Sequence, residues 1–207
     1  MSASSAGKSH WDGVYSSNAE DTYSWFQDNP ATSLELIGKF APSLDAPIID
    51  IGAGASRLVD ALLARGYSDI TILDLSEQAL DSVRKRLGER ASEVTMITGN
   101  ITQWQPSRSH AIWHDRAVLH FLTESQDQQA YIDALTAGSR AGSTVIISTF
   151  APEGPERCSG LPVRRYSPAE LAARLGASFA LVESRKEEHF TPGGRTQDFT
   201  VAIFKRL

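Results

Sequence analysis

Short apolar runs that alternate with helical patterns are the feature that most constrains the fold of this chain. Each run is rich in β-branched residues, which is typical of strands buried on both faces of a parallel sheet. Between the runs, apolar residues recur at helical spacing, as at Leu58 and Leu62, and Gly66 ends that stripe. The alternation predicts an α/β fold with one doubly wound, mostly parallel sheet. The five runs lie at residues 47–52, 69–76, 94–101, 110–118 and 143–150.

Further helix boundaries follow from glycine and from capping residues. Residues 80–87 form a second apolar stripe, which Gly88 ends. Thr123–Gln126 and Ser167–Glu170 have the pattern of capping boxes, so we expect a helix to begin at each of them.

The end of the chain departs from this alternation. Residues 179–190 and 197–207 are two extended runs, and the turn formers Pro192, Gly193 and Gly194 lie between them. They predict an antiparallel hairpin that closes one edge of the sheet and brings it to seven strands.

The composition disfavours several classes of protein. The 207 residues suffice for one well-buried core, and a formal charge of −5 disfavours a nucleic-acid partner. No uninterrupted run of about 18 apolar residues predicts a membrane span. Cys158 is the single cysteine, so no disulfide framework is possible within the chain, and we expect a cytoplasmic protein. Residues 1–9 are small and polar and predict a flexible tail.

The stretch "IIDIGAGAS" places glycines directly after the first apolar run. Gly52 and Gly54 would permit positive φ and let a ligand approach the backbone. Free N–H groups at the start of the next helix would favour an anion. The alternative is a tight turn with no ligand.

Two further strand ends carry polar side chains. Asp74 ends the second run, where a carboxylate can accept hydrogen bonds from both hydroxyls of a ribose. Asn100 ends the third, and its amide can pair with the edge of an adenine. A helix N-cap or a turn residue is the alternative at both positions. Together the three strand ends predict a site for a nucleoside with a carboxylate-bearing tail.

Two cofactors match that description. A dinucleotide fingerprint needs a third glycine at position 57, where this chain has Arg57, and a dehydrogenase would need more sequence for its substrate. S-adenosylmethionine is smaller and fits better, with S-adenosylhomocysteine as its product.

From about His10 to Leu207 the sequence resembles the class I S-adenosylmethionine-dependent methyltransferases. The motifs are "IIDIGAGAS", "ILDLS", "GNI", "WHDRAVLHFL" and the closing hairpin, whose last strand inserts antiparallel into the sheet in that family. Ser56 and Asn100 depart from the usual glycine and Gly-Asp of the family. The resemblance implies a Rossmann-like domain over residues 46–207. The cofactor-binding residues that it implies are Asp50, Gly52, Ala53, Gly54, Asp74, Leu75, Asn100, Ile101 and Asp115.

A narrower resemblance concerns "HWDGVY", "YSWF" and "YSPAELAARLG". These look like bacterial small-molecule methyltransferases of the thiopurine type, and also like small lysine methyltransferases. The resemblance implies that residues 1–45 form a tail and a helical lid, with Trp11, Tyr15 and Trp25 against the cofactor. Packing of these aromatic side chains onto the core is the alternative.

Residues near the end of the fourth run are candidates for catalysis. We expect His114 to act as a base and Asp115 to contact cofactor or substrate, because a hydroxyl or ammonium acceptor must lose a proton. Helix capping by the acid and simple packing of the histidines are the alternatives. No metal site is expected.

The loop over residues 150–167 is rich in proline and glycine and is a candidate for acceptor recognition. Solvated arginines and a packed cysteine are the alternatives. The expected acceptor-binding residues are Tyr15, His120, Cys158, Arg164, Arg165 and Tyr166.

These features predict transfer of a methyl group to a sulfur, nitrogen or oxygen atom of a small molecule. One alternative is a protein lysine methyltransferase, for which the acidic chain would attract a basic partner. The other is a nucleoside-binding sensor without catalysis.

Overall fold

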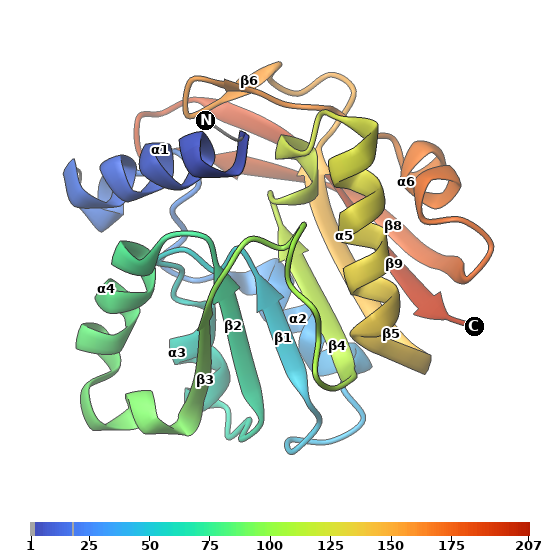
Figure 1. Ribbon diagram of the computed structural model, residues 1–207, viewed down its shortest axis with the longest axis horizontal. Coiled ribbons are helices and arrows are strands. Elements are labelled where there is room, and N and C mark those ends of the chain that lie inside the picture. The colour runs from blue at the N-terminus through green and yellow to red at the C-terminus, as the bar shows by residue number, and fades with distance from the viewer. Residues whose placement is uncertain (1–2, 18) are drawn as a thin grey trace.

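A seven-stranded sheet with helices on both faces organises the computed structural model, which describes residues 3–17 and 19–207 (Figure 1). Its strand order is β3-β2-β1-β4-β5-β9-β8, and the first five strands are mutually parallel. The strands are β1 (Ile48–Ile51), β2 (Ile70–Asp74), β3 (Val94–Thr98), β4 (His110–Arg116), β5 (Ser139–Phe150), β8 (Phe179–Phe190) and β9 (Thr196–Arg206). The predicted doubly wound α/β fold is confirmed.

Helices precede, connect and cover the strands. The α-helices are α1 (Ala3–Ser17), α2 (Ala31–Phe40), α3 (Leu58–Ala64), α4 (Glu77–Leu87), α5 (Ser125–Ala137) and α6 (Pro168–Leu175). Short 3-10 helices are η1 (Glu20–Thr22), η2 (Gly88–Glu93) and η3 (Leu119–Phe121). Over the described ranges, none of these helices has the length and apolar content that crossing a membrane requires.

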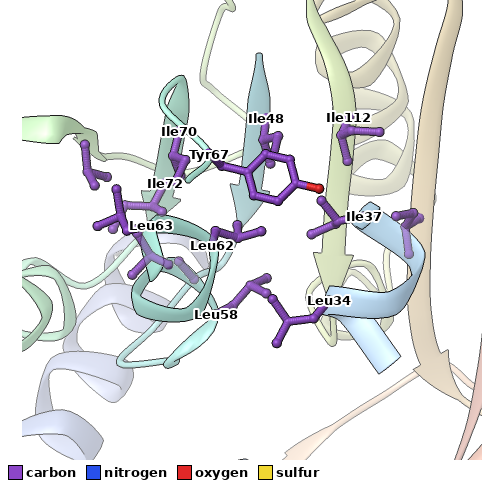
Figure 2. Packing of buried hydrophobic residues seen from close by; sticks show 14 of the residues in the cluster. Leu34, Ile37, Ile48, Leu58, Leu62, Leu63, Tyr67, Ile70, Ile72 and Ile112 are labelled. Atoms are coloured by element: carbon purple, nitrogen blue, oxygen red, sulfur yellow. The ribbon is translucent and has the colours of Figure 1, made fainter. Parts of the chain in front are cut away.

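Successive side chains of the buried strands point to opposite faces of the sheet, and they belong to two hydrophobic clusters, one on each face. Ile48 belongs to the cluster that contains α2 and α3, and Ile49 belongs to the cluster that contains α5 and α6. Figure 2 shows the first cluster, in which Leu34 and Ile37 of α2 face the sheet. α2 is therefore a core helix. The lid expected over residues 1–45 would be confined to the elements before α2, and the domain boundary at residue 45 stays a prediction.

The C-terminal hairpin is confirmed, and it has the expected order. β9 lies between β5 and β8 and runs antiparallel to both. Its turn is closed by a hydrogen bond from Thr191 N–H to Arg195 O at 2.8 Å. Because β9 is buried between two strands and β8 is half exposed, the apolar run falls on β9 and the charged residues fall on β8.

The predicted flexible tail at residues 1–9 is wrong for residues 3–9, since α1 begins at Ala3, whereas residues 1 and 2 lie outside the described residues. Two interactions support the helix. Lys8 pairs with Asp12 one turn later at 2.7 Å, and Asp12 also accepts a hydrogen bond from the Ser76 hydroxyl at the start of α4. The contact with Ser76 thus stabilises a helix in a segment whose composition favours a helix only weakly.

The two predicted capping boxes have different outcomes. The capping box at Thr123 does not form, because α5 begins at Ser125 with Glu124 at its N-cap. The box at Ser167 and Glu170 is confirmed in both directions. The loop over residues 150–167 contains a small strand pair, β6 (Arg157–Cys158) with β7 (Leu161–Pro162). Residues 159 and 160, which connect this pair, both have positive φ, as short hairpin turns require.

Gly52 lies where the chain leaves β1, and two constraints require glycine there. Its φ is +63°, in the left-handed region, and an added Cβ would overlap the side chain of Val118. Gly194 provides the control, since its φ is +75° and its Cβ would meet open space.

We predict that Gly52→Ala lowers the free energy of unfolding by about 2 to 4 kcal/mol, through strain and overpacking together. Gly194→Ala should cost about 1 kcal/mol, because only the backbone strain applies. Urea unfolding midpoints measure both. Equal losses would contradict the contact with Val118, and Val118→Ala should recover part of the loss at position 52 alone.

Candidate functional site

Two adjoining cavities open where the parallel strands end, at the edge over which α1 passes (Figure 1). The larger has a volume of about 150 Å³ and the smaller about 50 Å³. Trp25, Gly52 and Arg116 line both, so the cavities meet at these residues. The location agrees with the general rule that open parallel sheets bind ligands beyond their carboxyl ends.

The larger cavity brings together most of the residues predicted from the sequence. They come from α1, from the segment before α2, from the ends of β1, β2 and β3, and from β6. The predicted residues that line it are Trp11, Tyr15, Trp25, Gly52, Asp74, Leu75, Asn100, Ile101 and Cys158. Ala53 and Asp50 line the smaller cavity instead.

The glycine loop presents no free peptide N–H at Gly52, Ala53 or Gly54, while the free donors expected at the start of the next helix stay a prediction. Gly52 N–H donates to Leu73 O at 2.7 Å, Ala53 N–H donates to the same oxygen at 3.1 Å, and Gly54 N–H donates to Asp74 Oδ2 at 2.7 Å. Buried N–H groups must find acceptors, and the end of β2 supplies them. The loop therefore contributes its narrow backbone to the site and not a set of unpaired donors.

The buried Asp74 carboxylate holds two backbone segments together and also lines the larger cavity. Its Oδ2 accepts from Gly54 N–H and its Oδ1 accepts from Ser76 N–H, each at 2.7 Å. Burial raises the pKa of the Asp74 carboxyl to about 6, although these N–H groups act to lower it. Each carboxylate oxygen retains a further lone pair, and the residue lines the larger cavity.

Asn100 is partly committed to its own turn. Its Oδ1 accepts from both the N–H and the hydroxyl of Thr102 at 3.0 Å. The turn alternative considered for this residue therefore holds for the amide oxygen, while the residue still lines the larger cavity.

Aromatic rings from the N-terminal segment cover the cavities. The Tyr15 hydroxyl lies so close to Gly54 that a Cβ there would overlap it. Trp11 contacts Phe121 edge-on at 5.1 Å between centroids, and Trp25 stacks on Tyr23 at 4.9 Å. The half-buried rings line the cavities and join the segment before α2 to η3.

His114 and Asp50 form a buried pair between neighbouring strands. They are register partners in β4 and β1, and His114 Nδ1 lies 2.6 Å from Asp50 Oδ1. His114 Nε2 lies 2.9 Å from the Ser33 hydroxyl of α2. Both ring nitrogens are thus engaged, and all three residues line the smaller cavity.

Asp115 lines neither cavity, and its expected contact with cofactor or substrate stays a prediction. Alternation along β4 turns it toward α5, where its Oδ2 accepts from the Tyr131 hydroxyl at 2.7 Å. Its carboxylate also accepts from the N–H groups of Val118 and Leu119 at 2.8 and 3.1 Å. Burial raises its pKa to about 6. Asp115 thus bonds to N–H groups at the start of η3, as the helix-capping alternative predicts.

Four expected acceptor-binding residues are also placed elsewhere. His120 is buried between Phe121 and Phe150, and burial lowers its pKa to about 3. Tyr166 is buried in the core cluster on the α5 and α6 face. Arg164 lies over the Tyr166 ring and Arg165 pairs with Glu156. None of His120, Arg164, Arg165 and Tyr166 lines either cavity.

Sequence reasoning passed over Arg116, which ends β4 and lines both cavities. Period-two alternation places it on the same face as His114, and that signal could have found it. The next residue, Ala117, has φ of +71°, a strained conformation for a residue other than glycine. The remaining unpredicted residues of the larger cavity are Ile51, Leu73, Gly99, Ala117, Val118, Phe121 and Leu122.

Comparisons with known proteins agree with this architecture. Residues 48–140 match the family model described as a methyltransferase domain. An eEF1A lysine and N-terminal methyltransferase of Bos taurus is 23% identical over 124 residues, which are 58% of this chain and 17% of the relative. The chain thus spans about a sixth of the length of the curated relatives that it matches.

Solved structures share the fold over nearly the whole chain. A SAM-dependent methyltransferase from Anabaena variabilis superposes with a TM-score of 0.77 at 12% identity, covering 100% of this chain and 96% of the other. A glycopeptide N-methyltransferase complexed with S-adenosylhomocysteine gives a TM-score of 0.68 at 17% identity, covering 95% and 97%. The family match and the shared fold identify residues 48–140 as a methyltransferase domain in a chain with the class I methyltransferase fold.

Proposed function

We propose that this protein transfers a methyl group from S-adenosylmethionine to a sulfur, nitrogen or oxygen atom of a small molecule. The observation that carries the proposal is the larger cavity, where an acid from the end of β2 lies beside apolar and amide side chains from the ends of β2 and β3. A nucleoside needs this combination, because its sugar donates hydrogen bonds and its base offers two flat apolar faces.

The residues present fit the cofactor. Asp74 would accept from the ribose hydroxyls, and Leu75 and Ile101 would contact the base. The NH₂ group of Asn100 would face the base edge, since its oxygen is held by Thr102. Asp50 lines the adjoining smaller cavity, where a carboxylate would attract the ammonium of the amino-acid end. Bound S-adenosylmethionine would supply a methyl group already activated by its sulfonium.

The chain's own contribution is to exclude water and to align the acceptor, because transfer of an already activated methyl group needs little more. Trp11, Tyr15 and Trp25 cover the cavity, and burial raises the pKa of the Tyr15 hydroxyl, so that hydroxyl stays neutral. This enclosure supports a small acceptor.

Two alternatives retain some support. The eEF1A methyltransferase relatives favour a protein acceptor, and the net charge of −5 would suit a basic one. A sensor without catalysis would need the same nucleoside site. The aromatic rings that cover the cavity favour a small acceptor over a protein, and the transfer experiment below separates catalysis from sensing.

Transfer of a labelled methyl group distinguishes these functions. With labelled S-adenosylmethionine and a cell lysate, we expect label in the low-mass fraction and none with Asp74→Ala. Label in protein would favour the lysine alternative. Binding of S-adenosylhomocysteine without any transfer would favour the sensor, and tight binding of a nicotinamide dinucleotide alone would overturn the proposal.

The affinity for S-adenosylhomocysteine should depend on pH through Asp74. Ribose hydroxyls bond best to the ionised carboxylate, and with a pKa of about 6 only about a tenth of it is ionised at about pH 5. Calorimetry should therefore show affinity falling about tenfold from about pH 7.5 to about pH 5. Asp115→Asn should keep this dependence, because Asp115 has a similar pKa outside the cavities. Asp74→Asn should bind more weakly at every pH and lose the dependence.

We propose that His114 positions Asp50 and is not the base that the sequence suggested, since both of its nitrogens are engaged. His114→Asn should then lower affinity for S-adenosylhomocysteine by about fivefold, the effect of one lost hydrogen bond, and leave the pH profile of transfer unchanged. Unchanged affinity with a large fall in transfer and an altered pH profile would restore the role of base. Circular dichroism checks that the variant is folded.

A further inference from the structure

Arg116 is a half-buried cation that lacks a counter-ion within 4 Å, although Glu187 and Asp50 attract it from farther away. Its Nη1 donates to the backbone oxygen of Trp25 at 3.1 Å, whereas its Nε and Nη2 are buried and have no hydrogen-bond partner among the described residues. Among the residues that the structure describes, no carboxylate oxygen forms an ion pair with the Arg116 guanidinium. Other buried atoms near this edge, such as His120 Nε2, Thr149 Oγ1 and Gln197 Oε1, also lack a partner, but their residues line neither cavity.

Such a group is costly to the fold. A charged group with buried, unpartnered donors destabilises the folded protein, and the usual remedy is a partner of opposite charge. Burial lowers the pKa of the Arg116 guanidinium, but arginine starts so high that it stays charged at neutral pH. Because Arg116 lines both cavities, a bound anion could reach its free donors.

The surroundings of the guanidinium indicate which ligand the donors face. Its central carbon lies 5.0 Å from the ring of Phe199 in β9, and Cys158 of β6 lines the same cavity. The adenosine side of that cavity is formed by the ends of β2 and β3, which lie on the opposite side of β4 from β9. Arg116 therefore faces the part of the cavity beyond the proposed nucleoside.

We propose, on the basis of the proposed function, that Arg116 binds an anionic group of the methyl acceptor and so selects small acids over neutral molecules of the same shape. Nε and Nη2 lie on one side of a guanidinium and form the fork that binds a carboxylate through two parallel hydrogen bonds. The apolar walls from Trp25, Phe121 and Val118 would hold the body of such an acceptor.

Isosteric pairs of probes test this selection. In the complex with S-adenosylhomocysteine, calorimetry compares benzoate with benzamide and 4-mercaptobenzoate with 4-mercaptobenzamide. We expect at least one carboxylate to bind about 10- to 100-fold more tightly than its amide, as charge-assisted hydrogen bonds predict. Arg116→Met should abolish the preference, and Arg116→Lys should keep part of it. Arg165→Met, which removes an arginine outside both cavities, should leave it intact.

A second readout separates recognition from a structural role. Removing an unpaired buried charge should leave the thermal midpoint of Arg116→Met equal to or above that of the wild type without ligand. A marked fall would mean that Arg116 supports the fold, and would count against the proposal.

Three binding results would overturn the inference. The first is that the wild type shows no preference for a carboxylate over its amide, or binds neither. The second is that the preference survives in Arg116→Met. The third is that Arg116→Met loses affinity for S-adenosylhomocysteine. The last would mean that Arg116 holds the carboxylate of the cofactor. Failure of the wild type to bind S-adenosylhomocysteine would instead refute the proposed function itself.

Discussion

The carboxylate of Asp74 is the interaction on which the candidate site most depends. It accepts from Gly54 in the loop after β1 and from Ser76 at the start of α4, so it holds together two connections at the edge of the sheet. Without it, two buried N–H groups would lose their acceptor. The same carboxylate faces the larger cavity, and a group held this rigidly is well suited to orient a ligand.

Polar groups gather at this edge because the parallel strands all end there, and the protein itself satisfies the carboxylates among them. Asp50 bonds to His114, and Asp115 bonds to Tyr131 and to backbone N–H groups. Arg116 differs, since two of its donors are buried without partners. A satisfied buried polar group is explained by the fold, whereas an unsatisfied one that faces a cavity calls for a ligand.

The N-terminal segment has two structural roles. α2 is part of the core, since Leu34 and Ile37 pack against the sheet. The elements before it cover the cavities with Trp11, Tyr15 and Trp25 instead. This difference follows from composition, because α2 has a continuous apolar stripe, whereas α1 carries its aromatic residues among small and polar ones.

The sequence by itself determined the strands, most helices, the closing hairpin and the residues at the strand ends, because hydrophobic periodicity and turn chemistry are local properties. Only the tertiary structure decided which polar side chains those strand ends leave available. The periodicity of β4 could assign residues 114, 115 and 116 to faces. It could not reveal that Tyr131 engages Asp115, that Ser33 engages His114, or that two donors of Arg116 have no partner. The hydrogen bonds of the glycine loop to β2, and the contact that orders α1, likewise depend on residues distant in sequence. Such contacts depend on how whole elements pack, and no local pattern encodes them.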